Sequence, residues 1–169
     1  MRMTANYSFL VRISILLASL NSIFTGVLTW LVWHQESVIP LWGQRSINSY
    51  LFLTSFVMSF VLSVLASKLT HRAVSKRKIL PLHWHLKNQT MLDRLPSDTF
   101  HRSFIISLMG CCYAFLLVYL LNLYTEQQLE VSKFIKLNMV YSILLAAGAC
   151  VLSVYRALGA AYRNKRLNR

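Results

Sequence analysis

Four long segments of the chain contain no Asp, Glu, Lys or Arg: residues 13–33, 46–67, 103–125 and 137–155, with 21, 22, 23 and 19 residues. A helix needs about 20 apolar residues to cross a hydrocarbon core about 30 Å thick. Because lipid offers the backbone no hydrogen-bonding partners, each segment is expected to be helical. The sequence therefore predicts an all-α integral membrane protein, with one four-helix domain over residues 1–169.

The composition agrees with a membrane protein rather than a soluble one. Only 14% of the residues are charged, whereas soluble domains have about 25%. The net charge of +13 would suggest nucleic-acid binding in a soluble protein. The basic residues cluster beside the apolar segments instead, which indicates membrane topology and anionic lipid. We expect no nucleic-acid partner.

The segment from Lys68 to Arg102 divides the chain into two predicted hairpins. It holds 8 of the 18 Lys and Arg residues and 4 of the 5 His residues. Short loops, residues 34–45 and 126–136, join the spans within each hairpin, and Pro40 and Gly43 act as turn residues in the first. The sequence predicts that the two hairpins form a compact bundle with residues 68–102 as their linker.

The distribution of basic residues predicts the orientation. The two termini and the linker hold 15 Lys and Arg residues, and the two short loops hold 3. The positive-inside rule then places both termini and the linker in the cytoplasm, and we expect a bacterial cytoplasmic (inner) membrane. Trp30, Trp33 and Trp42 around the first loop are expected to mark the opposite membrane face.

A basic stripe follows the second span. Lys68, Arg72 and Lys76 recur every four residues, so the second helix is expected to continue past the membrane until Pro81 stops it. Residues 82–95 are predicted to form either an amphipathic surface helix or a loop, and Ser97 or Asp98 should cap the third helix. The predicted contacts with anionic headgroups or an acidic partner are Lys68, Arg72, Lys76, Arg77, Lys78 and Trp84.

Each span carries small residues at four-residue spacing, so that they share one helix face. Small residues let neighbouring backbones approach closely inside a bilayer, where apolar burial does not drive helix association. Four such ridges favour a compact bundle. The predicted packing residues are Ser14, Ala18, Ser22 and Gly26; Ser55, Ser59, Ser63 and Ser67; Ser103, Ser107 and Cys111; and Ala149, Ser153 and Ala157.

The two halves of the chain show a weak similarity. A shift of 90 residues aligns Arg12 with Arg102 and residues 61–64 with residues 151–154, which share the sequence VLSV. Identity over the aligned halves is only 9 of 71 positions. The hypothesis is a parallel tandem repeat whose two-fold axis follows the membrane normal.

Few residues suggest chemistry. The four uncharged spans contain no His either, so an ion path, proton relay or haem-binding His pair is not predicted, and neither is a cofactor or metal. Asn21 is expected to make an interhelical hydrogen bond, and the three cysteines to be buried packing residues. The histidines at 83 and 85 are interpreted as interfacial side chains, and Asp98 could pair with Arg102.

The sequence therefore favours a non-enzymatic interaction or regulatory component that acts on another membrane protein through its helix faces, or that self-associates. A small permease or transporter subunit working as an oligomer is the alternative, and an enzyme acting on lipid is a third hypothesis. No catalytic site is predicted.

Overall fold

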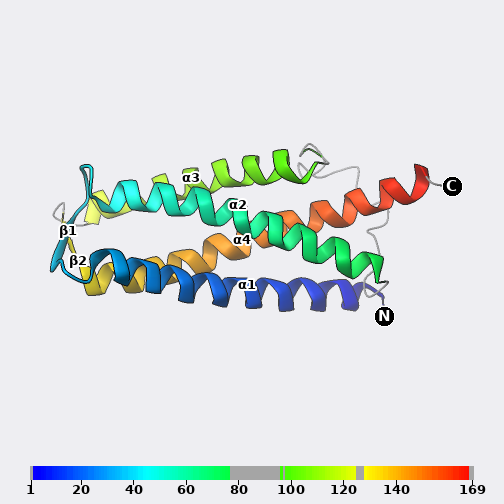
Figure 1. Cartoon of the computed structure of the whole chain (residues 1–169), viewed down its shortest axis with the longest axis horizontal. Helices are drawn as coiled ribbons and strands as arrows, with labels where there is room; N and C mark the ends of the chain where they lie inside the picture. The colour runs from blue at the N-terminus through cyan, green and yellow to red at the C-terminus, as the bar shows by residue number, and fades with distance from the viewer. Residues whose placement is uncertain (1, 77–95, 97, 125–127, 168–169) are drawn as a thin grey trace.

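The structure is a computed structural model that describes residues 2–76, 96, 98–124 and 128–167, with side chains placed only within residues 7–158 of these ranges. It consists of four helices and two short strands (Figure 1). In chain order they are α1 (Arg2–Trp33), β1 (Val38–Pro40), α2 (Ile47–Ser75), α3 (Thr99–Tyr124), β2 (Gln128–Glu130) and α4 (Val131–Leu167).

All four helices are long and apolar enough to cross a membrane, over Tyr7–Trp33, Ile47–Ser75, Thr99–Tyr124 and Val131–Leu158. The prediction of an all-α four-helix membrane bundle is confirmed. The helices extend beyond the predicted spans, because a helix can continue through the interface into water. One boundary was wrong: α4 begins at Val131, inside the loop predicted at residues 126–136, after the strand pairing of β2.

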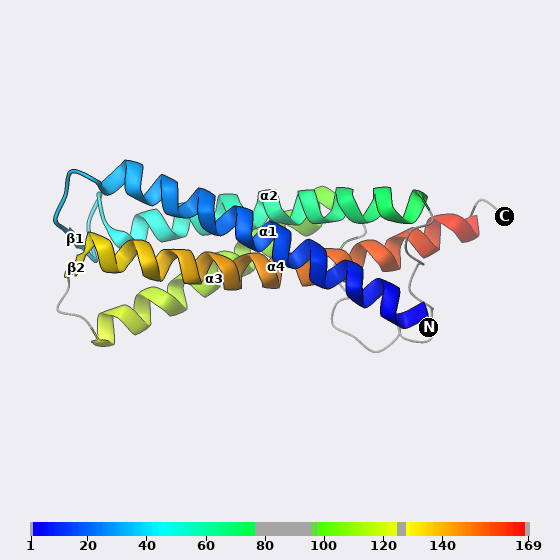
Figure 2. The same cartoon turned by 90° about the horizontal axis from the view of Figure 1, so that it is seen from below.

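The helices pack mainly between the two hairpins rather than within them. α1 lies on α4, and α2 lies on both α3 and α4, whereas α1 touches α2 little and α3 touches α4 little. The packing order is therefore α1, α4, α2, α3, with α4 and α2 in the middle. The start of α1, the end of α2, the start of α3 and the end of α4 lie at one end of the bundle, opposite the two strands (Figures 1 and 2).

The contacts follow the 90-residue shift detected in the sequence. Ile39 pairs with Leu129 in the antiparallel β1–β2 pair, and the hydroxyl of Ser153 donates to that of Ser63 at 2.8 Å. Residues in both pairs are 90 positions apart. Residues related by a two-fold axis touch one another only near the axis, so an approximate axis runs through the strand pair and the serine pair.

The contacts between α1 and α4 and between α3 and α2, away from the axis, are related by the same 90-residue shift. The amide Nδ2 of Asn21 on α1 donates to the carbonyl oxygen of Ser142 on α4 at 3.0 Å, which confirms its predicted interhelical bond. Adding 90 to the first number and subtracting 90 from the second gives Cys111 and Phe52. The thiol of Cys111 on α3 lies 4.0 Å from the carbonyl oxygen of Phe52 on α2. The α1–α4 and α3–α2 interfaces are thus related by the same approximate symmetry.

The strand pair closes one end of the bundle. Ile39 is fully buried there, against an apolar cluster that includes Phe134 and Trp33. Only 6% of Trp33 is exposed, and its ring meets Tyr50 on α2 edge-on at 6.4 Å. Its place at the headgroup level stays a prediction, and the sequence did not indicate that its ring packs against α2.

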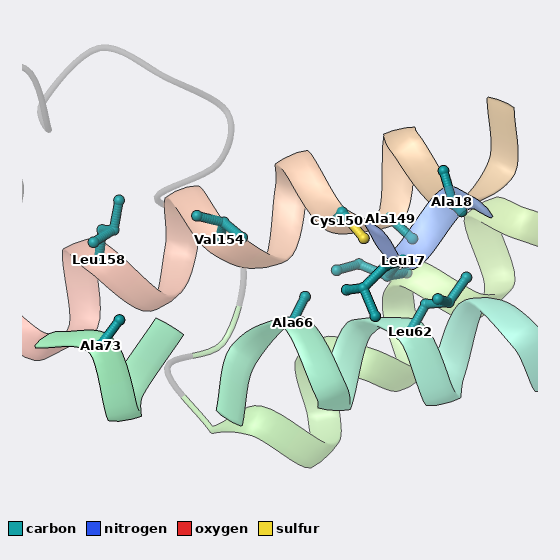
Figure 3. Packing of buried hydrophobic residues seen from close by; sticks show 11 residues of the cluster. Leu17, Ala18, Leu62, Ala66, Ala73, Ala149, Cys150, Val154 and Leu158 are labelled. Carbon is teal, nitrogen blue, oxygen red and sulfur yellow. The ribbon is translucent and has the colours of Figure 1, made fainter. Parts of the chain in front are cut away.

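Small side chains allow α2 and α4 to cross closely at the other end of the bundle. Ala66 and Ala73 on α2 face Val154 and Leu158 on α4 in one apolar cluster (Figure 3). Large apolar side chains are instead exposed on the outer faces of α1 and α3, where Phe24 and Phe115 are 55% and 60% exposed. This inside-out distribution suits a bundle surrounded by lipid.

Gly110 provides a test of the close α2–α3 packing. A Cβ atom added at Gly110 would collide with the hydroxyl of Ser59 and lie 3.2 Å from the carbonyl oxygen of Ser55. We expect Gly110→Ala to lower the free energy of unfolding by about 1–3 kcal/mol, a typical overpacking cost. Gly148→Ala is the matched control, because a Cβ at Gly148 meets nothing within 4 Å. Thermal unfolding in detergent would contradict this packing if both variants were equally stable.

Candidate functional site

Polar side chains of α2 form hydrogen bonds to α3 and α4 in the centre of the bundle. The hydroxyls of Ser55 and Tyr141 lie 2.7 Å apart. Ser63 accepts hydrogen bonds from Ser103 at 2.9 Å and Ser153 at 2.8 Å. These bonds join three helices at one point, and the hydroxyls replace the water that a bilayer interior lacks.

Ser67, the next residue on this face of α2, is hydrogen-bonded to a buried arginine. Nη2 of Arg102 on α3 donates to the hydroxyl of Ser67 on α2 at 2.7 Å, and none of the Arg102 side chain is exposed. Its Nε and Nη1 atoms have no hydrogen-bond acceptor. The prediction that the membrane spans contain no ionisable residue was wrong for α3. This helix begins at Thr99, before the uncharged segment, so the span includes Arg102.

A second buried arginine lies on α4. Arg156 is 5% exposed, and its charge acts repulsively on Arg102. His71, exposed near the end of α2, also interacts electrostatically with Arg102. We call Arg102, Arg156 and Ser67 the buried arginine site. Side chains from three helices, two of them arginines, meet there at the end of the bundle that carries the termini.

Asp98 defines the start of α3 and so positions Arg102. Its carboxylate Oδ2 accepts hydrogen bonds from the backbone N–H of His101 at 3.4 Å and pairs with the His101 ring at 2.7 Å. These bonds hold the pKa of Asp98 below its usual value. The charge of Asp98 attracts Arg102, but their expected side-chain pair is not formed because His101 holds the carboxylate. The expectation that Asp98 could cap this helix is met.

The depth of the site follows from the length of α3. Its 26 residues span about 39 Å at 1.5 Å per residue, longer than a hydrocarbon core of about 30 Å. If the excess is shared between the two ends, Arg102, three residues after the first helical residue, lies about where the hydrocarbon meets the headgroups. On this estimate the buried arginine site lies near one edge of the hydrocarbon rather than at the bilayer centre.

A groove opens where α3 and α4 fail to pack. Its linker-side hollow, of about 290 Å³, has Ile106, Gly110 and Gly148 in its lining. Its loop-side hollow, of about 420 Å³, has Leu120 and Val140 in its lining. Tyr113 and Leu144 line both hollows, so these form one groove, which we call the α3–α4 groove.

The groove leads towards the buried arginines. Ile106 and Leu152 line its linker-side end. Arg102 and Arg156 each lie one helical turn further along the same two helix faces, because residues four apart share a face. The buried arginine site thus lies directly beyond the linker-side end of the groove, on the same faces of α3 and α4.

The predicted packing residues lie largely inside the bundle. Ser14 and Cys111 are half-buried, and the other twelve are buried: Ala18, Ser22, Gly26, Ser55, Ser59, Ser63, Ser67, Ser103, Ser107, Ala149, Ser153 and Ala157. Among the cysteines, Cys150 is buried but Cys112 is exposed. The expectation of three buried thiols was wrong for Cys112, because adjacent residues point to different sides of a helix.

The predicted lipid or partner contacts are only partly described. Lys68, Arg72 and Lys76 are exposed at the end of α2, which stops at Ser75 before Pro81. Arg77, Lys78 and Trp84 lie outside the described residues, as do the histidines at 83 and 85. The possible surface helix at residues 82–95 lies outside them too.

Sequence reasoning missed the burial of Arg102 and Arg156. A signal was present, because each arginine adjoins a predicted packing residue, Ser103 or Ala157. Both had been assigned to the flanks of the uncharged spans. Only the continuation of α3 and α4 beyond those spans shows that the two side chains enter the bundle.

The buried arginine site has hydrogen-bond donors without acceptors. Within the described part of the chain, no group of three His, Cys, Asp or Glu residues could hold a metal ion. Guanidinium groups with free N–H donors can bind anions. Comparisons with protein-family models, curated proteins and solved structures found no match to this chain.

Ser63 offers a test of the central hydrogen bonds. Ser63→Ala would leave the buried hydroxyls of Ser103 and Ser153 without their shared partner. We expect the free energy of unfolding to fall by about 1–3 kcal/mol, the cost of leaving buried polar groups unsatisfied. Ser19→Ala is the control, because Ser19 is exposed on α1. Equal thermal stability of both variants in detergent would contradict a structural role for these bonds.

Proposed function

We propose that this protein is a non-enzymatic membrane component that binds a transmembrane helix of another membrane protein in the α3–α4 groove. The observation that carries the proposal is the groove itself. It is apolar, it runs along two helices that barely touch, and it is lined partly by exposed side chains such as Met109 and Leu144. An apolar helix could fill it.

Gly148 supports a helix as the occupant. It is exposed, and a Cβ at this position would meet nothing within 4 Å. Glycine at an open helix surface lets another backbone approach closely, which favours helix association in membranes. Gly110, on the opposite wall, is already covered by Ser59. Gly148 is thus the glycine available to a partner.

The second candidate function is a small permease or transporter subunit that works as an oligomer. Buried Arg102 favours it, because charged residues inside a membrane bundle often mark transport pathways. We rank it second because the central hydroxyls of Ser63, Ser103 and Ser153 bond to one another. None of these three serines lines either hollow of the groove.

We also propose that the protein resides in a bacterial cytoplasmic membrane with both termini and the linker in the cytoplasm. The excess of Lys and Arg in these parts of the chain supports this orientation. Reporter fusions after Arg2, Lys78 and Arg169 should report the cytoplasm, and fusions at Glu36 and Glu130 the other side. A non-cytoplasmic signal at Lys78 would refute the orientation.

Site-specific photo-crosslinking tests the groove. A photoreactive residue at Leu120 or Leu144 should give one discrete protein adduct in native membranes, and the same probe at exposed Leu20 on α1 should not. Mass spectrometry of the adduct distinguishes another protein from a second copy of the chain. Gly148→Leu should abolish the adduct at Leu144 by filling the groove.

The matched control for that substitution is Val140→Leu, which changes a groove residue that is already large. It should leave the adduct at Leu144 in place. Labelling of lipid alone at Leu120 and Leu144, as at Leu20, would refute the proposed docking groove.

A further inference from the structure

Arg102 is a buried cation with incomplete hydrogen bonding. Ser67 accepts from Nη2, while Nε and Nη1 have no acceptor. A buried charge is stable only when it is paired and hydrogen-bonded. The described residues supply one weak compensation, the attraction of exposed Asp98, whose carboxylate is already bonded to His101. Arg102 can therefore accept an additional anionic partner.

The surroundings of Arg102 define the sign of that partner. Arg156 is buried nearby and repels Arg102. Lys68, Arg72 and Lys76 are exposed on the end of α2. An anion placed between Arg102 and Arg156 would be attracted by both guanidinium groups and would reduce their mutual repulsion.

We propose that Arg102, Arg156 and Ser67 bind the phosphate of an anionic phospholipid headgroup. Nε and Nη1 of Arg102 are two guanidinium donors without an acceptor, and charge-assisted hydrogen bonds from such donors suit phosphate oxygens. The Arg102 side chain is covered, so the headgroup enters between α3 and α4, where these helices pack least. Arg156 closes the site from α4.

Depth favours a lipid over an acidic residue of a partner helix. If α3 is centred in the membrane, its length puts Arg102 near the edge of the hydrocarbon, next to the headgroup layer that holds the phospholipid phosphates. Exposed basic residues on α2 would raise the local concentration of anionic lipid. The site lies beyond the end of the α3–α4 groove, so it does not depend on the proposed partner helix, and the two proposals can fail separately.

Native mass spectrometry and thermal unfolding of the full-length protein test the site. The protein would be placed in nanodiscs of phosphatidylcholine with or without phosphatidylglycerol. We expect preferential retention of phosphatidylglycerol and a higher unfolding temperature in its presence. Arg102→Gln or Arg156→Gln should lower this retention about tenfold, the effect of losing a charge-assisted hydrogen bond.

The internal symmetry supplies a matched control. Arg12 is related to Arg102 by the 90-residue shift and sits at the corresponding position of α1, but it is exposed. Arg12→Gln removes the same charge and should leave retention unchanged. If Arg102→Gln does not fold, Arg102→Lys keeps the charge but lacks the guanidinium fork, and it should still lower retention.

Two further arms identify the source of the anion. Inorganic phosphate added to phosphatidylcholine nanodiscs should not reproduce the thermal shift, and oleate, a carboxylate lipid, should be retained less than phosphatidylglycerol. An equal shift with inorganic phosphate would overturn the lipid assignment. Unchanged retention in Arg102→Gln and Arg156→Gln, or equal loss in Arg12→Gln, would overturn the site itself.

Discussion

The structure depends on the close packing of one face of α2 against α3 and α4. In lipid, apolar side chains gain little by leaving one neighbour for another, so contact between small residues and hydrogen bonds must hold the helices together. Ser59 packs closely against Gly110 of α3. Ser63 accepts hydrogen bonds from Ser103 of α3 and Ser153 of α4. The outer helix α3 is attached to the bundle mainly through this face of α2.

The approximate two-fold symmetry explains why two helices are central and two peripheral. An axis through Ile39–Leu129 and Ser63–Ser153 places α2 and α4 beside it and α1 and α3 outside. The halves differ in their polar groups, however. Asn21 is strongly bonded across α1–α4, whereas its counterpart, Cys111, makes only a weak contact across α3–α2. Arg102 and its counterpart Arg12 are the same residue type but differ in burial, because Arg102 is buried and Arg12 is exposed.

The buried arginine site and the α3–α4 groove are neighbouring consequences of this divergence. Arg102 keeps two guanidinium donors without an acceptor, while two helices with little contact leave an apolar surface uncovered. These two features carry the proposals of an anionic headgroup at Arg102 and of a partner helix in the groove. Both features form only when α3 and α4 are positioned by α2.

The sequence by itself determined the number of membrane helices, the small-residue faces and the 90-residue relationship, because helix length and periodicity are local properties of the chain. It could not show that α1 packs on α4 rather than α2, that Trp33 turns inward, or that Cys112 is exposed. Nor could it show that Arg102 and Arg156 meet. These outcomes depend on which helix faces contact one another and how far each helix continues past its apolar segment. Only the tertiary packing decided them, because interhelical contacts join residues far apart in sequence.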